Sequence, residues 1–138
     1  MKYPFNIRTK YNLINDICFN GLLPNDFCMR WVSLDKKSKT DHDVAEVRFE
    51  NYRVKSLRIV NNPKDKRYSQ IESLLHEMIH IYIFLFNWKK DSIQDWHHNK
   101  YFLQLYQSKA RKLGFTEKQI DRELYSLTQW NNYWQKAA

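Results

Sequence analysis

The stretch Leu74-Leu75-His76-Glu77-Met78-Ile79-His80 places a His-Glu-x-x-His pattern inside an apolar run of the sequence. On a helix, residues four apart lie almost one above the other, so His76 and His80 can present imidazole nitrogens to one tetrahedral zinc ion. Glu77 lies about 100° further round the helix, where its carboxylate can accept a proton from a water molecule at the metal. The pattern therefore predicts one zinc ion, Glu77 as general base, and hydrolysis, most often of a peptide bond. The alternative is a helix with two hydrogen-bonded core histidines and no metal.

The length and composition of the chain predict a single compact domain over residues 1–138. Hydrophobic residues make up 43% and aromatic residues 16%, with 2 Gly and 3 Pro, so we expect a packed core and no long linker. Lysine and arginine number 23 against 15 acidic residues, a net charge of +8 that favours polyanionic partners such as DNA. These basic residues are scattered in short groups, as on an ordinary solvated surface. The sequence leaves both DNA binding and the oligomeric state open.

Signals for secretion or membrane insertion are not found in the sequence. The first ten residues contain no apolar h-region, and the longest uninterrupted apolar run, residues 81–86, is far shorter than the roughly 20 residues that span a bilayer. Cys18 and Cys28 show no C-x-x-C spacing, and we expect two buried thiols rather than a disulfide or a metal site. A cytoplasmic location without membrane contact is predicted.

The apolar periodicity and the turn residues predict a small sheet that one helix precedes and three helices follow in the chain. Helices are expected over residues 5–19, 68–86, from 96 or 97 to 113, and from a capping box at Thr116 and Gln119 onwards. Strands are expected over residues 27–33, 44–49 and 57–60, with a loop at 35–43 and a turn at 51–55. We expect these strands to pair antiparallel.

A catalytic zinc site needs a third protein ligand, and two neighbouring histidines are candidates. His97 and His98 follow His80 by 17 and 18 residues, enough for the next helix to return against the zinc helix. His98 is favoured because it lies four residues before Phe102, on the inward stripe of that helix. His97 is the alternative ligand, or else it contacts a ligand from behind or helps to hold substrate. His42 lies in a polar loop and is expected at the surface.

Three motifs follow one another along residues 12–113. They are Asn15-Asp16-x-x-Phe19-x-Gly21-x-Leu23-Pro24 before a strand that ends at Trp31, the stretch Leu74 to His80 quoted above, and His98-x-x-x-Phe102. In this order they resemble the SprT-like domain of bacterial SprT proteins and of the eukaryotic protease Spartan. The third motif is similar to the His-Gly-Pro-x-Phe segment that supplies the family's third zinc ligand, with Asn99-Lys100 in place of Gly-Pro.

The resemblance implies an α+β, zincin-like minimal metallopeptidase fold. Its parts would be an N-terminal helix, a three-stranded antiparallel sheet, a long zinc-binding helix, a third-ligand helix and a C-terminal helix. The resemblance also implies that His98 is the third zinc ligand beside His76 and His80. No C-x-x-C pair follows, so we expect no C-terminal zinc ribbon. Members with a known role cleave proteins bound or crosslinked to DNA, which would make DNA-associated proteins the substrates.

Two other functions compete with proteolysis. The first is a nucleic-acid-binding accessory protein that keeps a structural zinc ion and has no protease activity, with its basic loops and aromatic side chains making the contacts. The second is a scaffold with core histidines and no metal. A site with four protein ligands, or steeply salt-dependent DNA binding without cleavage, would favour the first. Purified protein without zinc would favour the second.

Overall fold

The computed structural model describes residues 3–33, 45–61, 69–86, 98 and 100–137. This part of the chain contains four α-helices and one three-stranded sheet, as an α+β fold requires. In chain order the elements are α1 (Ile7–Phe19), β1 (Cys28–Ser33), β2 (Ala45–Glu50), β3 (Arg53–Asn61), α2 (Gln70–Phe86), α3 (Lys100–Lys112) and α4 (Glu117–Ala137). The predicted loop at 35–43 and the predicted helix start at 96 or 97 fall outside the described residues.

The sheet is mixed, so the prediction of a wholly antiparallel sheet is wrong. The strand order is β1-β3-β2, with β2 antiparallel to β3 and β1 parallel to it. An alternating apolar pattern determines which face each side chain takes, but it does not determine the direction of the neighbouring strand. Here β3 lies in the centre, and the chain crosses from one of its edges to the other between β1 and β2.

A tight hairpin joins β2 to β3 and corrects the predicted turn at 51–55. Asn51 and Tyr52 both adopt positive φ angles, 52° and 63°, as the two central residues of a type I′ hairpin do. The strand therefore resumes at Arg53 rather than at Leu57. Its first four residues alternate between exposed and partly buried positions, with Val54 as their one apolar side chain, so the apolar pattern that marks a strand in sequence is weak there.

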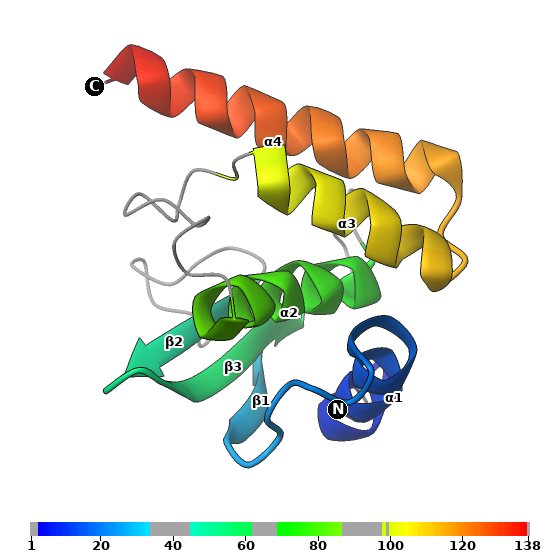
Figure 1. The fold of residues 1–138 in the computed structure, drawn as a ribbon, viewed down its shortest axis with the longest axis vertical. Helices are drawn as coiled ribbons and strands as arrows, with labels where there is room; N and C mark the ends of the chain where they lie inside the picture. Colours follow the sequence, from blue (N-terminus) through cyan, green and yellow to red (C-terminus); the bar gives the residue numbers. More distant parts are fainter. Residues whose placement is uncertain (1–2, 34–44, 62–68, 87–97, 99, 138) are drawn as a thin grey trace.

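The helix α2 lies at the centre of the fold. Figure 1 shows it between the sheet and α3, with α4 on the far side of α3. Its fully buried side chains face both layers, which explains why the helix has almost no polar surface; they include Leu74, Leu75, Met78, Ile79, Ile81 and Ile83. The β-branched residues of its last turns do not convert it to a strand, because the helix continues to Phe86.

The first and last turns of α1 are explained by the capping residues in its local sequence. The exposure of Ile17 depends instead on which face of the helix packs against the core. Asn6 caps the first turn by accepting a hydrogen bond from the Thr9 amide at 2.9 Å, and Asn20 with Gly21 ends the helix at positive φ. Ile17, although apolar, is 43% exposed. The inward stripe is already formed by residues 7, 11, 14 and 18, and position 17 lies about 100° away from the last of these.

The two cysteines are both free, and only one of them is buried. Cys18 lies in the core, whereas Cys28 is exposed, so the prediction of two buried thiols is wrong for Cys28. The reason is strand alternation, since the preceding Phe27 takes the inward position and Cys28 points the other way.

Among the described helices, none is long and apolar enough to span a membrane.

The C-terminal helix begins as predicted. The Gln119 side chain accepts a hydrogen bond from the Thr116 amide at 2.8 Å, and the Thr116 hydroxyl accepts one from the Gln119 amide at 3.1 Å. This reciprocal capping box fixes the start of α4. Ile120 and Leu127 then face the core, and Gly114, at φ 83°, closes the preceding helix.

Candidate metal centre

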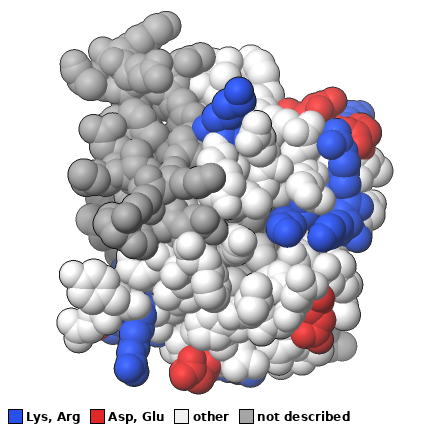
Figure 2. Space-filling view, viewed as in Figure 1, with Lys and Arg blue, Asp and Glu red and all other residues white. Residues whose placement is uncertain are grey.

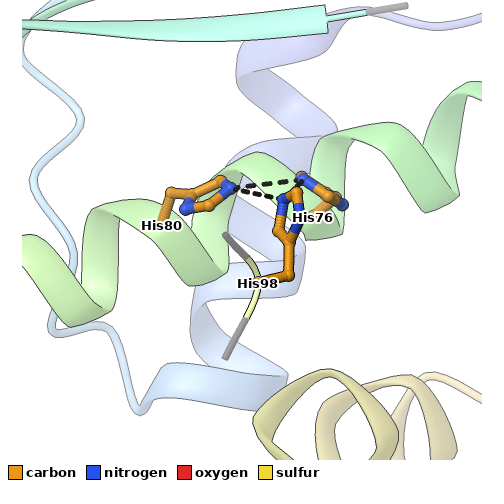
Figure 3. Close-up of side chains that lie close together, drawn as sticks. All are labelled: His76, His80 and His98. Atoms are coloured by element: carbon orange, nitrogen blue, oxygen red, sulfur yellow. Dashed lines mark hydrogen bonds between the residues drawn. The ribbon is translucent and has the colours of Figure 1, made fainter. Parts of the chain in front are cut away.

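Three histidines from two segments of the chain converge at one point. His76 and His80 lie one turn apart on α2, and His98 lies just before α3. Their Nε2 atoms are separated by 3.0 Å (His76 to His98), 3.2 Å (His76 to His80) and 3.3 Å (His80 to His98). Figure 3 shows the three rings pointing toward one another. The predicted grouping of His98 with His76 and His80 is thus present in the structure.

This arrangement fits a tetrahedrally bound metal ion. With metal–nitrogen bonds of about 2.0–2.1 Å, tetrahedral geometry places neighbouring ligand nitrogens about 3.3 Å apart. Hydrogen bonding cannot explain all three contacts, because each contact needs one donor and one acceptor, and a triangle of single nitrogens cannot satisfy that on every side. A cation, by contrast, accepts the lone pairs of all three nitrogens at once. The three histidines lie close enough to bind one metal ion.

Phe102 forms an apolar wall against all three imidazoles. Its ring centroid lies 4.9 Å from that of His76, 4.6 Å from that of His80 and 4.7 Å from that of His98. The side chain is buried and comes from the first turn of α3. This contact gives a physical reason for the His98-x-x-x-Phe102 spacing, since one turn of chain carries both a converging histidine and the ring that packs against it.

Glu77 lies beside this centre and is itself buried, with 7% of its surface exposed. Its negative charge is near enough to affect the ionisation of His76. Burial of the imidazole acts to lower the pKa of His76, but a hydrogen-bonded carboxylate of Glu123 and the charge of Glu77 act against this, and the net direction is upward. The carboxylate of Glu77 therefore acts on the histidine centre without being one of the three converging groups.

Glu123 is a site residue that the sequence reasoning missed. Glu123 belongs to α4, and its Oε1 lies 3.2 Å from Nδ1 of His76 on α2. One signal in the sequence could have pointed to it: an acidic residue stands on the inward stripe of the last helix, between Ile120 and Leu127. The partner of that residue could not be found from sequence, because it lies 47 positions away.

Within the described parts of the chain, the three histidines are the one group of potential metal ligands that lies close together. His97, the alternative ligand, and His42, the expected surface histidine, fall outside the described residues, so those two predictions stay as they are. We compared the chain with protein families, with curated proteins and with solved structures, and none matches it significantly. The resemblance to the SprT-like family therefore stays a prediction from the three motifs.

Proposed function

We propose that this protein is a zinc-dependent metalloprotease of the SprT-like type. The observation that carries the proposal is the triangle of Nε2 atoms from His76, His80 and His98, which lie 3.0 to 3.3 Å apart, close to the spacing of ligands around a tetrahedral metal. Three histidine ligands leave a fourth position for water or substrate, as catalytic zinc sites do. Imidazole also suits other transition metals, and zinc is favoured here because the His-Glu-x-x-His pattern carries its own general base.

Each protein group has a definite task in this proposal. When bound, zinc supplies Lewis-acid chemistry, making a water molecule more acidic and polarising the substrate carbonyl. The Glu77 carboxylate accepts a proton from that water as the water oxygen bonds to the carbonyl carbon. The same group then gives the proton to the amide nitrogen as the carbon–nitrogen bond breaks, releasing an acid and an amine. Glu77 suits this role because it adjoins His76 on α2 and its charge acts on that histidine.

The substrate class in the proposal is protein or peptide, with DNA-associated proteins included because of the net charge of +8. Figure 2 shows Lys and Arg side chains gathered on the side where α3 ends and α4 begins, with acidic side chains next to them. Lys109, Arg111 and Lys112 belong to this end of α3, and Arg111 pairs with Glu117 at 2.9 Å. We include a cytoplasmic location in the proposal, since free thiols at Cys18 and Cys28 suit a reducing compartment.

The second candidate is a nucleic-acid-binding accessory protein whose zinc is structural. The basic residues at the end of α3 favour it, and a structural zinc site would need a fourth protein ligand. Among the described residues the group holds three histidines, which favours the open, catalytic arrangement.

Cleavage of an unfolded protein under metal control tests the proposal. Purified protein should contain about one zinc per chain and cut a denatured substrate; a chelator should abolish cleavage, and added zinc should restore it. Bound zinc together with salt-dependent DNA binding, and no cleavage of several unfolded substrates with or without DNA, would favour the accessory protein instead.

A further inference from the structure

Two adjacent charged residues of α4 reach across to α2 at the metal centre. Arg122 donates from Nη2 to both carboxylate oxygens of Glu72, at 2.8 and 3.0 Å. Glu123, the next residue, places Oε1 3.2 Å from Nδ1 of His76. Glu72 and His76 are themselves one helical turn apart on α2. Two consecutive residues of α4 therefore contact the face of α2 that carries His76.

Both acidic partners in these contacts are buried, whereas Arg122 itself is 41% exposed. The side chain of Glu72 is 0% exposed and that of Glu123 is 8% exposed. Glu123 also lies between Ile120 and Leu127, on the stripe where an apolar residue would pack without the need for a polar partner. Removing a carboxylate from water is costly unless hydrogen bonds compensate for the loss. Packing alone therefore gives no reason for an acidic residue at position 123.

The position of the Glu123 carboxylate selects one form of His76. A neutral imidazole carries a proton on one nitrogen and a lone pair on the other, and a carboxylate near Nδ1 favours the proton there. The lone pair is then on Nε2, the atom that faces the nitrogens of His80 and His98. Since Glu123 contacts the other nitrogen of the ring, it is not placed as a metal ligand.

We propose that Glu123 is a positioning residue of the metal centre, which holds the His76 ring in its Nδ1-protonated form with Nε2 directed at the ion. The Arg122–Glu72 pair anchors the same turn of α4 on α2 beside it. Helix α4 is thus part of the metal centre although it supplies no ligand. This inference rests on the proposed metal binding, but not on proteolysis. Carboxylates that orient metal-bound histidines in this way typically contribute about 10- to 100-fold to metal affinity.

Zinc affinity and the His76 tautomer test the inference together. Glu123→Ala should weaken zinc binding by about 10- to 100-fold in a competition titration with a chelating indicator. Glu123→Gln, whose amide oxygen can still accept from Nδ1, should lose less. Asp121→Asn is the matched control, because it removes the same charge from an exposed position of the same helix and should leave the affinity unchanged. Nitrogen-15 NMR of the metal-free protein should find His76 protonated at Nδ1 in wild type and shifted toward the Nε2-protonated form in Glu123→Ala.

A purely structural role for Glu123 gives a different result. In that case Glu123→Ala would lower the melting temperature of the metal-free protein, while zinc affinity stayed within twofold of wild type and the His76 tautomer did not change. That outcome would overturn the inference, and Glu123→Leu, which fills the buried position without an acceptor for Nδ1, provides the same comparison if the alanine variant does not fold. Wild-type protein that binds zinc but does not hydrolyse peptides would refute the proposed protease and leave this inference standing. Wild-type protein that binds no zinc would refute both.

Discussion

Helices α2 and α4 both contact the three-histidine centre, but their residues reach it in different ways. Helix α2 provides His76 and His80 at a spacing of four, so the local geometry of one helix brings the two side chains together. Helix α4 provides Glu123, whose contact with His76 depends on how two distant helices pack. A motif within one helix can thus be predicted from the sequence. A residue that orients the motif from another helix can be identified only from the three-dimensional structure.

The largest expected effect concerns α2 itself. His80→Ala removes one of three converging nitrogens, so we expect loss of bound zinc and loss of all hydrolysis. Metal content by plasma mass spectrometry, together with the cleavage assay, measures both. His42→Ala is the control, since the sequence predicts a surface position for that residue, and it should keep metal and activity. Zinc retained at one equivalent in His80→Ala would contradict the assignment.

A change at Glu77 should separate chemistry from metal binding on the same helix. Glu77→Gln keeps the size of the side chain but removes the base, so kcat should fall by about 10²- to 10⁴-fold while zinc content stays near one per chain. Circular dichroism should find the fold unchanged. Activity at the wild-type rate would show that Glu77 is not the general base, whatever the metal content.

Removing the metal should test how strongly the centre stabilises the fold by linking α2 to His98, just before α3. An ion that binds only the folded protein stabilises it by about 2.7 kcal/mol when free metal is at 100 times its dissociation constant. Thermal unfolding should therefore shift upward when zinc is added to the metal-free protein. His80→Ala, treated in the same way, should show no shift. An equal shift in both proteins would place the stabilising ion elsewhere.

The smallest expected effect is at the start of α4, away from the metal. Thr116→Ala removes the hydroxyl of the capping box, which should lower the free energy of unfolding by about 1 kcal/mol. Zinc affinity should not change, because the residues that contact α2 lie nearly two turns further along the helix. Chemical denaturation and metal titration of one preparation provide both numbers. A large loss of zinc affinity here would mean that all of α4, rather than Glu123, determines the site.

The sequence predicted those parts of the molecule that depend on local periodicity. The α2 helix, the capping box at Thr116 and the grouping of His98 with Phe102 all follow from residues within two turns of each other. The direction of β1 was not predictable from alternation, and the hairpin at Asn51 and Tyr52 lacks the glycine that usually marks such a turn. Long-range pairing explains the error in the direction of β1 and the omission of Glu123, whereas the hairpin was missed because its local turn signal is absent.

The most direct test of the central claim is the coordination of the bound metal in the purified protein. X-ray absorption at the zinc edge, or an anomalous difference map from crystals, should find one zinc ion bound by three imidazole nitrogens from His76, His80 and His98, at about 2.0–2.1 Å, with water or another small ligand in the fourth position. A fourth protein ligand would contradict an open catalytic site and favour a structural zinc ion. Absence of zinc from these three histidines would contradict the account as a whole.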